Sequence, residues 1–70
     1  MPDATYAISE IVGTSTESLE QAIRNGVSKA GDTLRNLDWF EVTDIRGFLG
    51  HSAEIKHFQV TMKIGFRYED

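Results

Sequence analysis

The sequence predicts an α+β fold of β-α-β-β order, in which one long helix packs on a three-stranded antiparallel sheet. Three observations support this prediction. Apolar residues recur at steps of three and four between Leu19 and Leu37, which is the spacing of one helix face. Apolar and polar residues alternate between Phe58 and Tyr68, as in a strand with one covered face. A shorter alternating segment, Tyr6 to Val12, precedes the helix.

The length of the chain bounds its architecture. With 70 residues and 7.9 kDa, residues 1–70 form one small domain, near the size at which a single core is only just sufficient. Such domains often rely on disulfides, a metal or self-association, and the absence of cysteine removes disulfides and thiolate metal sites. We therefore expect the chain to form an oligomer with copies of itself.

Charge and hydropathy exclude some partners. The net charge of −4 and the pI near 5.0 argue against binding to the phosphate backbone of nucleic acids. No apolar run is long enough to span a membrane, and the first six residues lack the basic and apolar regions of a secretory signal. The expectation is a cytoplasmic protein with neither a nucleic-acid nor a membrane partner.

The first strand is expected to end at a turn at Gly13. In residues 14–17, Thr-Ser-Thr-Glu, Thr14 and Glu17 have the spacing of a capping box, and Ser15 is an equally suitable N-cap. A helix of about twenty residues should follow. Gly26 and Gly31 lie inside it, where each costs roughly 1 kcal/mol relative to alanine. Either a close neighbour or simple tolerance would explain these two glycines.

Two long strands, Trp39 to Leu49 and Glu54 to Tyr68, are predicted to form a hairpin around residues 50–53. The last strand is expected to be the central one. The middle strand changes phase between Val42 and Ile45, which indicates a β-bulge near Thr43 and Asp44. The bulge would bring Asp44 roughly opposite Gln59. It would place Phe40, Val42 and Ile45 on the helix side of the sheet, and Trp39, Glu41, Arg46 and Phe48 on the other.

One helix cannot cover both faces of strands this long, so the second face and both edges should stay open. Exposed apolar side chains such as Trp39, Phe48 and Ile55 on such a face usually mark an interface or a binding groove. A partly buried core or interface aromatic explains Trp39 taken alone. Together with Gln59, a donor and acceptor, and Arg46, a cationic fork, Trp39 would suit the flat ring, heterocycle edge and phosphate of a flavin nucleotide.

Other chemistry finds little support in the sequence. The two histidines, His51 and His57, do not have the spacing of a metal site, so no metal is expected. Glu41 and Asp44 could form a carboxylate pair, but nothing in the sequence fixes their separation. Neither a nucleophile signature nor a nucleotide-binding glycine motif is present. We therefore expect a binding protein and not an enzyme.

Several short segments resemble a known family. They are Glu10-Ile11-Val12-Gly13-Thr14-Ser15, Leu37-Asp38-Trp39-Phe40-Glu41-Val42, Ile45-Arg46-Gly47, Phe58-Gln59-Val60 and Gly65-Phe66-Arg67. In these segments, in length, in the expected element order and in its lack of cysteine, the chain resembles the bacterial dodecins over essentially all of residues 1–70.

The resemblance implies a hollow homododecamer that stores or sequesters a flavin, chiefly FMN, without turning over a substrate. It implies that two flavin rings stack between symmetry-related tryptophans at the position of Trp39. Gln59 would bind the pyrimidine edge and Arg46 the phosphate, while Asp44 falls at an acidic position near the pocket. Arg67 matches an arginine that bacterial members use for coenzyme A. A purely structural or coenzyme A-binding oligomer without flavin storage is the alternative that stays open.

Overall fold

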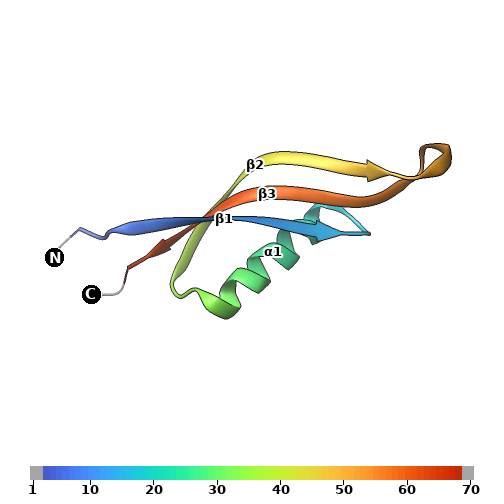
Figure 1. Ribbon diagram of the computed structural model, residues 1–70. Coiled ribbons are helices and arrows are strands. Elements are labelled where there is room, and N and C mark those ends of the chain that lie inside the picture. Colours follow the sequence, from blue (N-terminus) through green and yellow to red (C-terminus); the bar gives the residue numbers. More distant parts are fainter. Residues whose placement is uncertain (1–2, 69–70) are drawn as a thin grey trace.

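The computed structural model describes residues 3–68, and it has the predicted order of elements (Figure 1). The predicted α+β fold is confirmed. Its elements are β1 (Tyr6–Ser15), α1 (Leu19–Thr33), β2 (Leu37–Leu49), a 3₁₀ turn η1 (His51–Ala53) and β3 (Ile55–Arg67). The strands form one antiparallel sheet in the order β1-β3-β2, so the last strand is central, as predicted.

The β-bulge predicted from the phase change is confirmed, because the pairing of β2 with β3 shifts between Val42 and Asp44. The predicted pairing of Asp44 with Gln59 is wrong. Asp44 lies opposite Thr61, and it is Arg46 that lies opposite Gln59. A further irregularity at the base of the hairpin, between Phe48 and Leu49, helps set this register. Turn geometry fixes the register of a hairpin, and the residues of this turn do not reveal it in advance.

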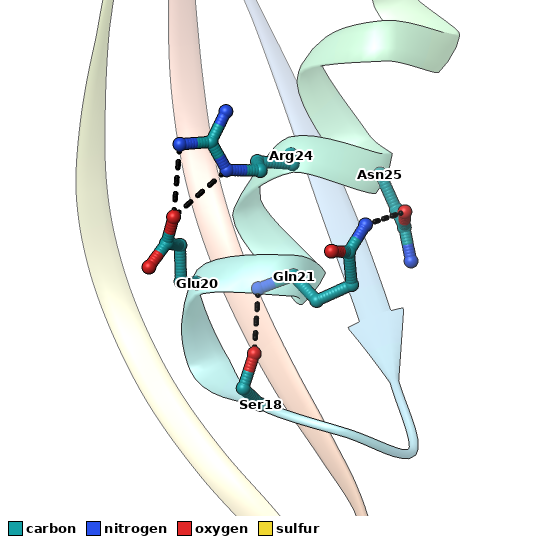
Figure 2. Close-up of polar contacts among 5 residues, drawn as sticks. All are labelled: Ser18, Glu20, Gln21, Arg24 and Asn25. Atoms are coloured by element: carbon teal, nitrogen blue, oxygen red, sulfur yellow. Dashed lines mark hydrogen bonds and ion pairs between the residues drawn. The ribbon is translucent and has the colours of Figure 1, made fainter.

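The start of the helix differs from the prediction. β1 does not end at Gly13 but continues to Ser15, and the N-cap is Ser18, whose Oγ accepts a 2.9 Å hydrogen bond from the Gln21 backbone N–H (Figure 2). The Ser15 hydroxyl instead accepts from the Glu17 backbone N–H at 2.9 Å and so closes the turn before the helix. Serine suits both tasks, and local sequence does not distinguish them.

The helix is also shorter than the predicted twenty residues, since α1 has 15 residues. It ends at Thr33 because Leu34 is extended and Asn36 adopts a left-handed backbone conformation with φ of 61°. Asparagine is among the few residues other than glycine that adopt this conformation readily. Leu37, the last residue of the predicted apolar stripe, therefore opens β2.

Close packing of α1 on the sheet explains one of its two glycines. A methyl group on Gly26 would lie 2.8 Å from Met62 Cε and 3.4 Å from the Cα of Gly13. Gly13 in turn faces the backbone of Ala22, where a Cβ would overlap the carbonyl oxygen. A methyl on Gly31 would meet only Leu37 Cδ1, at 3.9 Å. The helix and β1 therefore touch backbone to backbone at Gly13 and Gly26, while Gly31 has room for a side chain.

The core of the protomer is small. Its buried apolar residues within residues 3–68 are Ala22, Ala30, Val60, Met62 and Ile64. Alternate residues of β3 supply its three large side chains, as predicted. α1 packs on β1 and β3 and leaves β2 largely uncovered, so that Phe40 and Ile45 are 49% and 56% exposed even on the helix side. No helix within the described residues is long and apolar enough to cross a membrane.

Candidate functional site

The face of the sheet turned away from α1, here called the uncovered face, carries the residues that the sequence predicted for a ligand site. The pairing of the strands arranges them in rows across the sheet. In order along β3, the rows are Tyr6 with Arg67; Ile8, Gly65 and Trp39; Glu10, Lys63 and Glu41; Val12, Thr61 and Asp44; Thr14, Gln59 and Arg46; and His57 with Phe48. The predicted placement of Trp39, Glu41, Arg46 and Phe48 on this face agrees with the register.

Trp39 is held as a flat, partly exposed platform. Its indole lies directly on the backbone of Gly65, at a position where any Cβ would overlap the six-membered ring. The ring of Tyr6 meets the indole edge to face, with centroids 5.2 Å apart and an interplanar angle of 64°. With one side supported in this way and 40% of the residue still exposed, Trp39 is oriented to stack on a planar ligand.

A polar group occupies a different part of the same face. The Arg46 guanidinium binds the Asp44 carboxylate, with Nη2 and Nε lying 2.9 and 3.0 Å from Oδ2. Gln59 lies beside Arg46 on the central strand, and within residues 3–68 no hydrogen bond uses its side-chain amide. The amide can therefore donate to and accept from a ligand edge, next to a cation suited to an anionic group.

The structure separates the stacking platform from this polar group. Trp39 lies opposite Gly65, six residues along β3 from Gln59. At roughly 3.3 Å per residue, the two sites are about 20 Å apart along the strand. A single ring system cannot stack on Trp39 and reach Gln59 of the same protomer. The sequence prediction located both residues on one face correctly, but their distance along the sheet depended on the register.

Arg67 lies at the other end of the uncovered face, opposite Tyr6. Its backbone is bound to Asn36 through a 3.1 Å N–H to carbonyl bond and a 3.3 Å bond from the Asn36 side-chain amide. It borders a shallow hollow of about 430 Å³ behind the C-terminal end of α1. The residues that line this hollow are Thr33, Leu34, Arg35, Asn36, Phe66, Arg67 and Tyr68.

Sequence reasoning missed three contacts on this face. Gly65 and Tyr6 support Trp39, and Phe48 stacks on His57 with ring centroids 4.5 Å apart. A glycine inside an otherwise regular strand is a recognised sign of a close approach, so Gly65 could have been found from the sequence. The other two contacts depend on the register. Within residues 3–68, no group of three or more potential ligand side chains could hold a metal ion.

Known proteins resemble this chain in both sequence and structure. A family model described as Dodecin matches residues 5–69. The dodecin of Thermus thermophilus is 51% identical over 65 residues, which cover 93% of this chain and 93% of the relative. Among solved structures, the dodecin from Streptomyces davaonensis has a TM-score of 0.93 and 54% identity, and it covers 99% of this chain and 100% of its own. The dodecin from Streptomyces coelicolor has a TM-score of 0.91 and 48% identity, with coverage of 100% and 99%.

Proposed function

The chain belongs to the dodecin family, and from this premise we propose that it is a flavin-binding storage protein that sequesters FMN in a homododecamer. The observation that carries the proposal is the supported indole of Trp39. Its ring is partly exposed, lies on the backbone of Gly65 and contacts the ring of Tyr6. It therefore offers a rigid π surface to a flat ring. An isoalloxazine ring has the shape and the aromatic character that such a platform favours.

The polar residues on the same face, Gln59, Arg46 and Asp44, favour a flavin over an aromatic ligand that has no polar edge or phosphate. Gln59 has an amide without a partner among the described residues, which suits the donor and acceptor edge of the pyrimidine ring. Arg46 carries a guanidinium that can bind a phosphate, and Asp44 forms an ion pair with it. FMN combines the ring, the polar edge and the phosphate in one molecule, so these three residues fit it together.

The distance between Trp39 and Gln59 means that the site requires more than one copy of the chain. A flavin ring stacked on Trp39 of one protomer would contact Gln59 and Arg46 of a second protomer whose sheet lies across the ring. The isolated protomer also exposes 5285 Å², while a folded monomer of this mass exposes about 4,400 Å². Self-association would cover the excess and complete the site in the same step.

The proposed mechanism is sequestration without turnover. Trp39 can donate an electron to a photoexcited flavin stacked on it and take the same electron back, so that the excitation is lost without net chemistry. We propose a protective role on this basis, in which Trp39 holds the flavin and dissipates its excitation.

A second candidate function rests on the hollow beside Arg67. The arginine borders a space of about 430 Å³ that is also lined by Arg35, Asn36 and two aromatic side chains. Cationic and aromatic groups together suit a nucleotide carrying several phosphates, such as coenzyme A. The alternative is thus an oligomer that binds coenzyme A or has a structural role only, without storing flavin.

The visible absorbance spectrum of the purified protein tests the proposal. We expect a yellow protein that quenches the fluorescence of added FMN. Trp39→Ala should weaken FMN binding by tenfold or more, since stacking on an aromatic side chain contributes about 1–3 kcal/mol. Trp39→Phe keeps a ring and should lose less. A colourless oligomer that leaves FMN fluorescence unchanged but binds coenzyme A would favour the alternative.

A further inference from the structure

Phe48 and His57 form an aromatic pair on the uncovered face that the proposed site does not use. They lie opposite each other on β2 and β3, with nearly parallel rings at 15° and centroids 4.5 Å apart. Phe48 is 43% exposed, and His57 is half-buried against it. Among residues 3–68, none forms a hydrogen bond or ion pair with either imidazole nitrogen. Phe48 therefore covers one side of the imidazole and leaves its polar edge available.

The register places this pair directly beside Arg46 and Gln59. His57 is two residues from Gln59 on the same face of β3, and it is the diagonal neighbour of Arg46 across the strands. Diagonal neighbours in an antiparallel sheet are about 7–8 Å apart, which long side chains can span. An anionic group bound to Arg46 is therefore within reach of the edge of His57.

The charged groups around His57 indicate a role for its side chain in binding an anion. Arg46 and Asp44, both on β2, are the nearest charged groups on its face, because Thr14 of β1 is uncharged and α1 lies on the other side of the sheet. Glu54 and Lys56 precede His57 on the hairpin. Asp44 already offsets the charge of Arg46, so an anion at this position meets a carboxylate as well as a cation. A second cation would restore the attraction.

We propose that His57 determines specificity for phosphorylated flavins, with its imidazolium joining Arg46 in binding the phosphate and Phe48 positioning its ring. The inference rests on the proposed flavin site and adds to it a dependence on pH. The preference for FMN over riboflavin increases as an imidazole at this position gains a proton. The second ionisation of the phosphate, near pH 6, acts in the opposite direction but is common to all variants.

The test compares the affinities of riboflavin and FMN in the assembled protein, measured by quenching of flavin fluorescence. Both are determined at about pH 8 and at about pH 5.5. The readout is the ratio of the riboflavin Kd to the FMN Kd, because the ring contacts are common to the two ligands. The variants are His57→Gln, Phe48→Leu and, as a matched control, His51→Gln in the exposed hairpin turn.

At the acidic pH, the wild-type ratio should exceed that of His57→Gln by about threefold, the effect of one partly exposed ion pair. At the alkaline pH the two ratios should agree. His51→Gln should follow the wild type, and Phe48→Leu should fall between the wild type and His57→Gln. Equal ratios for wild type and His57→Gln at both pH values would overturn the inference, as would an equal loss of both ligands in His57→Gln. Failure of the wild type to bind either flavin would instead reject the proposed function, and this inference with it.

Discussion

At the scale of single residues, the uncovered face depends on one glycine. The indole of Trp39 rests on the backbone of Gly65, and this contact, with Tyr6 at its edge, fixes the plane in which a ligand can stack. A side chain at position 65 would have to share the space of the indole ring. The platform is therefore built jointly by Trp39 and by the absence of a side chain opposite it.

Gly65→Ala tests this arrangement. The new methyl group should displace the indole and weaken FMN binding at least tenfold, because the stacking geometry is lost. The matched control is Gly47→Ala, where a methyl would lie 3.7 Å from the His57 carbonyl oxygen, an ordinary van der Waals contact, and should leave FMN binding unchanged. Fluorescence quenching titrations measure both. Equal affinities for the two variants would show that Gly65 does not support the platform.

The ion pair between Arg46 and Asp44 predicts opposite effects for its two members. Asp44→Asn removes the carboxylate that competes for the guanidinium, so FMN should bind about threefold more tightly. Arg46→Gln should weaken FMN binding by a similar or larger factor. Neither change should alter riboflavin affinity, which serves as the internal control. Weaker FMN binding in Asp44→Asn would mean that the carboxylate's main effect is to hold Arg46 in its binding position.

At the scale of the elements, sequence patterns were sufficient to predict the core face of β3 and the bulge of β2. The alternation of β3 fixed which of its residues enter the core, and the phase change of β2 located the bulge, because side chains of a strand alternate strictly between faces. The register of Asp44 and Gln59 was not accessible in this way, since it depends on the turn after Leu49. The N-cap was also missed, because Ser15 and Ser18 carry the same hydroxyl and only their backbone positions differ.

For the candidate site, the sequence predicted which face of the sheet its residues share but not their spacing, because the spacing depends on the same register. Composition and phase placed Trp39, Arg46 and Gln59 on one face, and the register then separated the first of these from the other two by about 20 Å at the rise of a strand. The support from Tyr6 comes from a strand far away in sequence, so no local pattern could indicate it.

The two glycines of α1 make a matched pair for measuring how the helix packs. Gly31→Ala should raise the free energy of unfolding by about 1 kcal/mol, because alanine is the better helix former and the site has room. Gly26→Ala should lower it by about 1 kcal/mol, because the cost of overpacking against buried Met62 and the backbone of Gly13 exceeds the same gain. Denaturant unfolding at one fixed protein concentration measures both. Stabilisation of equal size in the two variants would contradict the close approach.

At the scale of the whole molecule, the protomer is elongated, and α1 covers only part of its sheet. Its radius of gyration is 14.7 Å, compared with about 11 Å for a compact chain of this length. The β2–β3 hairpin continues past the ends of β1 and α1, so its tip has neither a neighbouring strand nor a helix of its own chain (Figure 1). Such a shape is expected of a subunit whose remaining contacts are made by other copies.

Ile45→Lys tests that expectation. Ile45 is 56% exposed on the helix side of β2, beyond the part of the sheet that α1 covers. If a second copy covers it, a lysine should shift the protein to smaller species in size-exclusion chromatography, since a buried unpaired charge is costly. Thr16→Lys adds the same charge in the exposed turn before α1 and should elute with the wild type. Identical elution of all three proteins would exclude an interface at Ile45.

The strand order of the sheet also constrains how the protein is made. β1 pairs only with β3, and the register joins Tyr6, near the start of the chain, to Arg67, near its end. During synthesis, β1 and α1 leave the ribosome before the strand that connects them to β2 exists. Pairings of such high sequence separation form slowly and leave strand edges open to aggregation in the meantime. The sheet can therefore close only after β3 has left the ribosome, and chains truncated before β3 would have no sheet to join.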